Sequence, residues 1–234
     1  MIQKVFRHEL KYYINYFEYH SLRNRLKAVL KKDKFSDKDG NYHIRSLYFD
    51  SINNEALFEK QAGVLERNKY RIRIYNLSDK VIKLENKERI GQFIHKTSQI
   101  ITKQEYLDII QKNYSNLDRN KTLLNKFIID SEINLYSPKV IVDYVREAYI
   151  SEISNIRITF DKSLKTGLYN TNIFDDITTI DVIEEPKMIL EIKYDNFLPD
   201  YIKNILQIES AQRYAISKYV ICRKFSKENS WEDN

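Results

Sequence analysis

Five short segments of the chain carry charged residues at alternate positions, with apolar residues between them. In the clearest one, Lys69 to Tyr75, cations stand at positions 69, 71 and 73 and isoleucines at 72 and 74. The other four segments cover residues 7–11, 83–87, 157–161 and 190–194. Because successive side chains of a β-strand point to opposite faces, each segment predicts a strand with one ionic face and one mostly apolar face.

Such alternation has two interpretations. A half-exposed strand shows it when the charges face water and the apolar side lies on the core. In a closed sheet, the charges line a channel and the apolar side turns outward beneath amphipathic helices. Five segments dominated by Arg and Lys, in a chain with four or five expected amphipathic helices, favour the channel. Water and a bound anion would fill it, because unpaired cations that face each other are costly to desolvate.

The pattern predicts further elements around these segments. We expect strands over residues 5–14, 43–50, 67–76, 80–88, 92–101, 138–150, 155–161, 178–184 and 187–194. We expect helices over 17–32, from Asp50 or Ser51 to Gly63, over 102–113 and 118–131, from Pro199, and over 211–227. Thr102 and Glu105 form a capping box at one of these helix starts. Many antiparallel strands with inserted helices give an α+β fold built on one closed antiparallel sheet.

Composition narrows the class of protein. With 234 residues, 42% hydrophobic and 31% charged, the chain is expected to fold as one large globular domain over 1–225 with a disordered tail over 226–234. A single cysteine, Cys222, excludes an intramolecular disulfide and suits a reducing compartment. No apolar run approaches the ~18 residues of a membrane span, and the N-terminus lacks a signal-peptide pattern, so we expect a cytoplasmic protein.

Charge points to an anionic partner. The net charge is +6 and the isoelectric point is near 9.1. No glycine-rich phosphate loop is present, so side chains would have to hold a nucleotide. The scattered histidines and the single cysteine give no zinc-site spacing. Aromatic residues interleaved with Lys and Arg could stack on RNA, but no RNA-binding signature occurs, so a nucleic acid partner is not expected.

Several short motifs, each weak alone, follow one another along most of the chain. They are Arg7–Tyr12, Ser46–Asp50, Gly63 with Arg67, Lys69, Arg71, Arg73 and Tyr75, then Leu84–Lys87, Val142–Tyr149, Arg157–Asp161, Leu190–Lys193 and Ser217–Tyr219. This ordered set resembles the VTC domain family, the polyphosphate polymerase branch of the triphosphate tunnel metalloenzymes. The resemblance implies a β-barrel tunnel with a basic interior and surrounding helices. It also implies transfer of the γ-phosphate of ATP to a growing polyphosphate chain.

The resemblance assigns roles to individual residues. The catalytic cations that it implies are Lys11, Arg71, Arg73, Lys87, Arg146, Arg157, Lys193 and Lys218. The substrate-binding residues that it implies are Lys60, Lys96, Tyr144, Arg213 and Ser217. Mn²⁺ or Mg²⁺ would be held by Glu191, with Glu9 and Glu85 as further candidates, together with the phosphates. These residue types suit phosphoryl transfer, which depends mainly on positioning and charge neutralisation.

Three positions depart from the family pattern. Ala215 stands where eukaryotic polymerases carry a lysine, and Arg213 is its nearest substitute. Lys60 stands where an arginine is expected. Arg7 replaces the first of two glutamates that open the related tunnel hydrolases, which weakens that assignment. Two alternatives stay open: a metal-dependent tri- or polyphosphate hydrolase on the same fold, and a non-catalytic polyanion-binding module.

Overall fold

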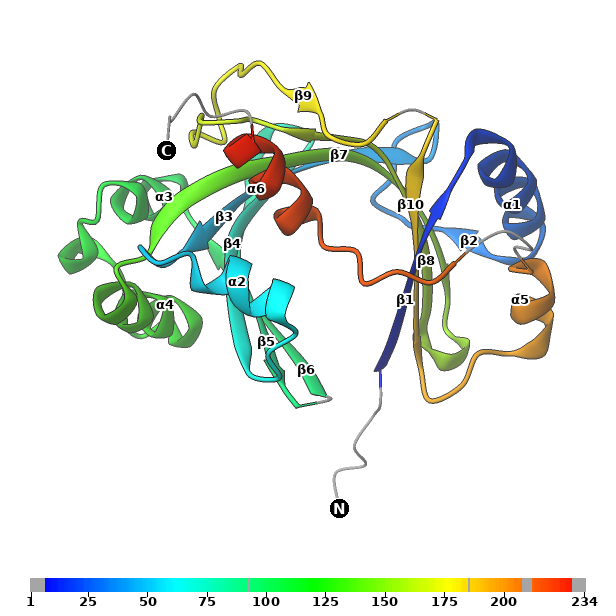
Figure 1. Ribbon diagram of the computed structural model, residues 1–234, viewed down its shortest axis with the longest axis horizontal. Coiled ribbons are helices and arrows are strands. Elements are labelled where there is room, and N and C mark those ends of the chain that lie inside the picture. The colour runs from blue at the N-terminus through cyan, green and yellow to red at the C-terminus, as the bar shows by residue number, and fades with distance from the viewer. Residues whose placement is uncertain (1–6, 92, 185, 208–211, 229–234) are drawn as a thin grey trace. The chain divides into compact units, whose positions relative to one another are not determined.

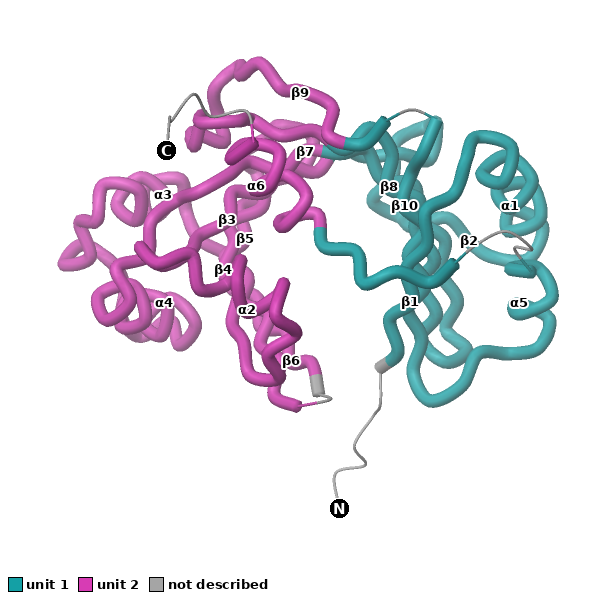
Figure 2. The backbone as a smooth tube through the Cα atoms, viewed as in Figure 1, with its two compact units in different colours: residues 1–43, 144–164, 183–217 teal, residues 44–143, 165–182, 218–234 magenta. Residues whose placement is uncertain are grey.

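The computed structural model describes residues 7–91, 93–184, 186–207 and 212–228. The chain forms two compact units (Figure 2). Unit 1 contains residues 1–43, 144–164 and 183–217, and unit 2 contains 44–143, 165–182 and 218–234. Within the described ranges, no helix is long and apolar enough to cross a membrane.

Unit 1 is built on antiparallel strands in the order β1-β10-β8-β7, with two helices packed on one side (Figure 1). The strands are β1 (Arg7–Ile14), β10 (Met188–Asp195), β8 (Ile156–Thr166), β7 (Ser137–Ser151) and the short β2 (Lys31–Lys32), which pairs with β7. The helices are α1 (Tyr16–Val29) and α5 (Asp200–Ile205), and a 3₁₀ turn covers Ile153–Asn155. Asn15 and Glu18 form a capping box at the start of α1.

Unit 2 is built on an antiparallel meander that continues from residues 137–143 of β7 in the order β7-β3-β4-β5-β6 (Figure 1). The strands are β3 (Asn41–Asp50), β4 (Arg67–Tyr75), β5 (Ser78–Ile90), β6 (Phe93–Ile101) and the short β9 (Ile180–Asp181), which pairs with the end of β8. The helices are α2 (Glu55–Ala62), α3 (Lys103–Ile110), α4 (Thr122–Asn134) and α6 (Lys218–Glu228), with a 3₁₀ turn over Tyr114–Asn116.

Local signals in the sequence explain several element ends. Thr102 and Glu105 make the predicted capping box at the start of α3. Gly63 ends α2 in the left-handed region with φ of 74°, which glycine adopts without strain. Asn76 and Leu77 both have positive φ angles, 51° and 53°, and connect β4 to β5 in a tight hairpin.

The apolar faces of both sheets lie beneath helices. In unit 2, Ile72 and Leu84 pack with Tyr106 of α3 and Phe127 of α4, and all are buried. In unit 1, the same arrangement places buried strand residues against the apolar side of α1 and α5: Ile158, Leu190 and Ile192 against Leu22, Leu26 and Ile202. The predicted parity is therefore confirmed within each unit, and the alternate side chains of these strands point away from the helices.

Some predicted boundaries are wrong. The last helix, predicted over 211–227, begins only at Lys218 and ends at Glu228. Residues before it are extended because Arg213 forms a β-bridge with Tyr12 and the Tyr214 amide donates to the Lys11 carbonyl at 3.0 Å. Residues 1–6, 92, 185, 208–211 and 229–234, which include ends of predicted strands, part of that helix and most of the predicted tail, lie outside the described ranges.

Two other helix ends also differ. The helix predicted to begin at Asp50 or Ser51 starts at Glu55. Asp50 still caps it from a distance, because its carboxylate accepts from the amides of Ala56 at 2.8 Å and Leu57 at 3.1 Å. The helix predicted to reach residue 32 ends at Val29, since Lys31 and Lys32 pair with β7. The single domain over 1–225 stays a prediction.

The parity of β4 gives a stability prediction. Ile72 is 0% exposed beneath α3 and α4, so Ile72→Asp buries a carboxylate among apolar side chains. We expect it to destabilise the protein by about 4 kcal/mol or more, a loss of ~10 °C or more in melting temperature. Arg71→Ala changes the opposite face, and Glu85 keeps other cationic neighbours there, so its melting temperature should stay within a few degrees of wild type. Thermal unfolding followed by circular dichroism compares the two, and equal losses would contradict the assigned parity.

Candidate functional site

Unit 2 gathers predicted basic residues on the face of its sheet opposite α3 and α4. Cross-strand pairing places Lys69 of β4 opposite Lys87 of β5, and Lys87 opposite Lys96 of β6. Directly opposed residues of neighbouring strands share a face. Arg71 and Arg73 have the same parity on β4 as Lys69. We call these five cations the basic face of unit 2.

Glu85 is the acidic centre of this basic face. Arg71 donates to it from Nε at 2.6 Å, Arg73 Nη1 lies 3.7 Å from it, and Lys96 forms a close ion pair with it. Glu85 is only 3% exposed. Burial alone would raise the pKa of its carboxyl, but the three cations hold that pKa well below its usual range. Glu85 therefore stays ionised and holds these cations together.

Two residues of β3 complete the basic face. The Tyr48 hydroxyl accepts from Arg71 Nη1 at 2.8 Å, and Arg73 Nε donates to the Ser46 hydroxyl at 3.0 Å. Burial would raise the pKa of Tyr48, but the two guanidinium groups lower it below its ordinary value. Neither residue was predicted as a site residue, although both belong to a recognised motif. Their alternate positions on β3 are the signal that could have identified them.

Helices α2 and α6 contribute further cations to the same face. Lys60, in the last turn of α2, is close enough to Lys69 for its charge to lower the pKa of that ammonium. Lys218, the first residue of α6, lowers the pKa of Tyr48 in the same way. The Lys69 ammonium lies 4.7 Å from the centre of the Tyr219 ring of α6. Unit 2 thus brings together Arg71, Arg73, Lys60, Lys87, Lys96 and Lys218 from the predicted set.

Unit 1 has an ionic face on β1, β10 and β8. Lys11 lies opposite Glu191, and Glu9 lies opposite Lys193, which is itself opposite Arg157. We call these five residues the ionic face of unit 1. Charges alternate along β1 and β10 and across this pair of strands, whereas the basic face of unit 2 is mostly cationic.

Glu191 is the centre of the ionic face. Its carboxylate lies 2.9 Å from Lys193 Nζ, 3.5 Å from Arg146 Nη2 and 3.8 Å from Lys11 Nζ. It is 4% exposed, so these cations offset the cost of burying its charge. Lys11 also contacts Glu9 at 2.7 Å and donates to the Ile216 carbonyl at 3.1 Å.

The two arginines of unit 1 that were predicted as catalytic cations are fixed by carboxylates that were not predicted as site residues. Arg146 binds Asp161 through two hydrogen bonds of 2.6 and 2.8 Å. Its guanidinium carbon lies 5.3 Å from the centre of the Tyr144 ring. Arg157 Nη2 donates to Asp33 at 2.6 Å and to the Tyr42 hydroxyl at 2.8 Å. These contacts restrict the conformations of both arginine side chains, so less conformational entropy is lost when an anion binds to them.

The segment before α6 contacts the ionic face of unit 1 through its backbone. The Ile216 carbonyl accepts a hydrogen bond from Lys11. Ser217 is half-buried, and Arg213 pairs with Tyr12 through its backbone while remaining exposed. Substrate-binding roles for Arg213 and Ser217 stay predictions.

The metal-ligand candidates divide between the two units. Glu9 and Glu191 approach the same Lys11 ammonium on the ionic face of unit 1, whereas Glu85 belongs to unit 2. Among the described residues, no group of three or more His, Cys, Asp or Glu side chains is arranged to hold a metal ion by itself. Mg²⁺ and Mn²⁺ at phosphate sites use one or two carboxylates together with phosphate oxygens. Glu9 and Glu191 fit that type of site.

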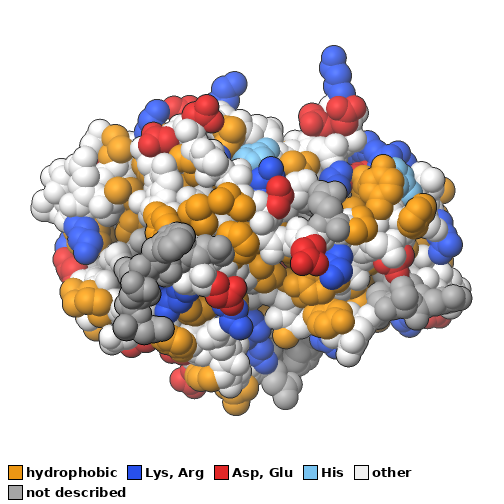
Figure 3. Space-filling model, turned by 45° about the horizontal axis from the view of Figure 1, so that its top comes forward, with side chains coloured by type: hydrophobic (Ala, Val, Ile, Leu, Met, Phe, Trp, Pro, Cys, Tyr) orange, Lys and Arg blue, Asp and Glu red, His pale blue; other side chains and the backbone are white. Residues whose placement is uncertain are grey.

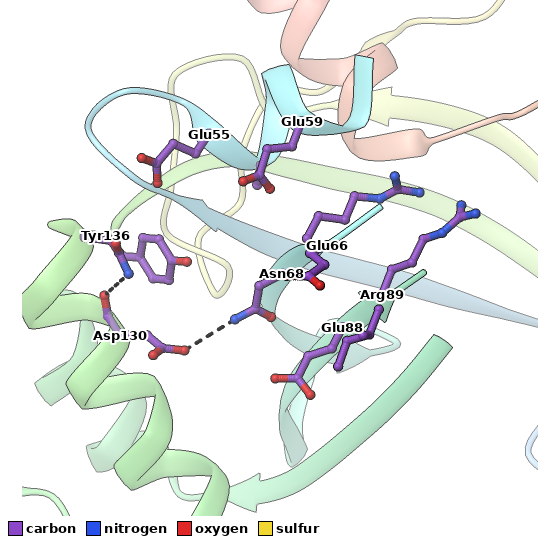
Figure 4. A pocket seen from close by; sticks show the side chains of 12 residues that line it. Glu55, Glu59, Glu66, Asn68, Glu88, Arg89, Asp130 and Tyr136 are labelled. Carbon is purple, nitrogen blue, oxygen red and sulfur yellow. Dashed lines mark hydrogen bonds between the residues drawn. The ribbon is translucent and has the colours of Figure 1, made fainter. Parts of the chain in front are cut away.

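Unit 2 also contains a cavity of about 350 Å³ with a different character (Figure 4). It lies between α2, α4 and the ends of β4 and β5, and Asn68 donates to Asp130 across it at 3.3 Å. Five carboxylates and two arginines line it, among other residues: Glu55, Glu59, Glu66, Glu88, Asp130, Arg67 and Arg89. An excess of carboxylates disfavours phosphate, and none of the predicted site residues lines this cavity.

Figure 3 shows one surface of the molecule. Lys and Arg side chains are interspersed there with Asp, Glu and apolar side chains.

Comparisons with known proteins find a matching family model and similar solved structures. A family model described as the VTC domain matches residues 6–227. The Hippeastrum protein HpAC1, whose description names adenylyl cyclase and reports a dominant triphosphatase activity, has a similar structure. It is 15% identical, with 93% of this chain and 95% of that chain covered and a TM-score of 0.58.

A second similar structure is that of a Bacillus halodurans protein assigned as an adenylate cyclase candidate. It is 13% identical, with 85% of this chain and 84% of that chain covered and a TM-score of 0.50. The likeness to these two structures confirms the predicted fold class, an α+β fold on a curled antiparallel sheet with surrounding helices. A sequence comparison with curated proteins finds no significant match.

Proposed function

The chain belongs to the VTC domain family, and we propose on that premise that it is an ATP-dependent polyphosphate polymerase. Family and fold support a function in triphosphate or polyphosphate chemistry. The observation that carries the proposal is the basic face of unit 2, where Arg71, Arg73 and Lys96 surround a single buried carboxylate. Cations outnumber that carboxylate, so the face has capacity for an anion with several charges.

In the proposed reaction, a terminal oxygen of the polyphosphate chain attacks the γ-phosphorus of ATP. The bond from the γ-phosphorus to the bridging oxygen breaks, ADP leaves with that electron pair, and the chain grows by one phosphate. Phosphoryl transfer needs little covalent chemistry from protein, so side chains act by alignment and charge neutralisation. Arg71 and Arg73 can each bind phosphate oxygens through two donors, and Lys87 and Lys96 act as point charges.

A divalent ion would be held by Glu191 and Glu9 together with substrate phosphates. Mn²⁺ or Mg²⁺ would neutralise phosphate oxygens and polarise the transferred group. Lys11, Arg146 and Lys193 surround Glu191 and keep its carboxylate in place. We assign Glu85 a different role, as the counterion that positions Arg71 and Arg73, because its oxygens already accept from Arg71 and Lys96.

A hydrolase is the second candidate, since HpAC1 is described as having a dominant triphosphatase activity. The same cations and carboxylates would serve with water as the acceptor. A non-catalytic polyanion-binding module is the third candidate. For all three, we expect a cytosolic protein, because ATP and polyphosphate are available there and Cys222 is a buried free thiol.

One experiment separates these functions. Purified protein is incubated with ATP, Mn²⁺ and a pyrophosphate primer, and phosphorus NMR follows the products. We expect signals from internal phosphates of a chain. Orthophosphate without polymer would support the hydrolase instead, and unchanged ATP would support the binding module. The Arg71→Ala/Arg73→Ala double variant, purified in parallel, controls for contaminating enzymes.

A further inference from the structure

Lys69 occupies an unusual position on the basic face of unit 2. It is not among the residues that the sequence assigns to the site. Lys87 lies opposite it on β5, Arg67 precedes it by two positions on β4, and Lys60 approaches from α2. The side chain is largely withdrawn from solvent, and its ammonium lies 4.7 Å from the centre of the Tyr219 ring. Three cations thus surround a fourth in a partly desolvated place.

Acidic groups near this cluster offset it only in part. Asp50 of β3 favours the charged form of Lys69, but its carboxylate also accepts from Tyr219 and from two amides of α2. Glu59 of α2 is a further carboxylate that interacts electrostatically with Lys69. Burial, followed by the charges of Lys60, Arg67 and Lys87, lowers the pKa of Lys69 to about 7. Arginine neighbours keep their charge throughout the accessible pH range.

We propose that Lys69 takes up a proton when a phosphate anion binds beside it, which makes anion binding on this face dependent on pH. The proposal rests on the proposed function, in that it requires phosphates to bind the basic face of unit 2. In this proposal, anion binding induces the positive charge of Lys69, whereas the neighbouring arginines are charged with or without the anion.

The direction of the effect follows from linkage. With a pKa of about 7, the empty site holds Lys69 mostly uncharged at pH 8. A bound anion favours the ammonium and raises its pKa toward the ordinary value of 10.5. Binding at pH 8 therefore takes up a proton, and affinity falls as pH rises from about 7 toward the raised pKa. Well below pH 7, Lys69 is charged in both states and contributes no pH dependence.

The matched variant is Lys69→Arg, which keeps a cation at this position but removes the proton exchange. Calorimetry with inorganic tripolyphosphate at pH 8, in two buffers of different ionisation enthalpy, gives the number of protons taken up. We expect wild type to take up about 0.5 to 1 proton more than Lys69→Arg. Protons exchanged by tripolyphosphate itself are common to both proteins and cancel in the difference. Lys224→Arg, an exposed position on α6, should behave as wild type.

A second measurement needs no ligand. NMR of the lysine side chains, with the Lys69 signal assigned by its loss in Lys69→Arg, should show a titration midpoint near 7 in the empty protein. A midpoint above about 9 would overturn the inference and leave the proposed function standing. Equal proton uptake by both proteins would do the same. No tripolyphosphate binding to wild type would overturn both the inference and the proposed function.

Discussion

Replacing Arg71 or Arg73 by alanine is expected to lower kcat/KM with ATP by about 30- to 1,000-fold, equivalent to ~2–4 kcal/mol of transition-state stabilisation. The two guanidinium groups share the Glu85 carboxylate, with Nη atoms 2.6 and 3.7 Å from it, so they occupy one small region of the basic face. A single triphosphate can therefore contact both. Each substitution removes a preorganised cation from the charge that develops during transfer.

Control variants distinguish the loss of these two guanidinium groups from the loss of a positive charge elsewhere on the protein. Arg119→Ala removes an exposed arginine from the loop before α4 and should retain wild-type turnover. Arg71→Lys and Arg73→Lys keep the charge but lose the paired donors, so their turnover should lie between those of wild type and alanine. Melting temperatures check that every variant is folded. Wild-type turnover in both alanine variants would remove the basic face from the proposed site.

The two faces of each sheet could be predicted because side chains of a strand alternate between faces with a period of two residues, so a short segment is enough to show the pattern. Alternation at Arg71, Ile72 and Arg73 needs no knowledge of distant residues, and the side chains of a strand must obey it. The interpretation that apolar faces lie beneath helices is confirmed by Ile72 against α3 and α4, and by Ile158 against α1. Capping at Thr102 was equally predictable, since both partners lie within four residues.

The structural features that could not be predicted depend on contacts between segments that are far apart in the sequence. The residues before Lys218 carry a helical pattern, but pairing of Arg213 with Tyr12 of β1 holds them extended. Tertiary contacts routinely override local propensity in this way. Charges on the helix side of the sheets are a second case. Glu147 is 0% exposed beneath α1, where it accepts from Arg23 at 2.8 Å.

The candidate site likewise has residues that the sequence could identify and residues that it could not. Most of its cations follow the strand alternation, so the sequence could identify Arg71 and Arg157 as members of ionic faces, whereas Arg146 came from the family resemblance alone. Their carboxylate partners required the structure: Asp33 binds Arg157 across 124 positions of the chain. The lowered pKa of Lys69 likewise depends on α2 and on two strands, which no local pattern relates.

The Glu191→Gln variant is expected to lose metal-dependent turnover while binding tripolyphosphate within roughly tenfold of wild type. Glutamine keeps the size and hydrogen bonding of the side chain but removes the charge that a divalent ion needs. Lys11, Arg146 and Lys193 remain beside it, with less negative charge to offset them, so the anion should still bind. Calorimetry with tripolyphosphate and turnover as a function of Mn²⁺ concentration measure the two properties separately.

This comparison distinguishes a metal ligand from a simple counterion. If Glu191 served only to neutralise its three cationic neighbours, its replacement would strengthen anion binding and leave turnover and its Mn²⁺ dependence unchanged. Loss of turnover with retained binding requires the carboxylate during the chemical step. Glu132→Gln, at an exposed position on α4, is the matched control and should show wild-type values for both properties. Full turnover of Glu191→Gln at every Mn²⁺ concentration would exclude Glu191 as a metal ligand and leave the ionic face of unit 1 with a purely electrostatic role.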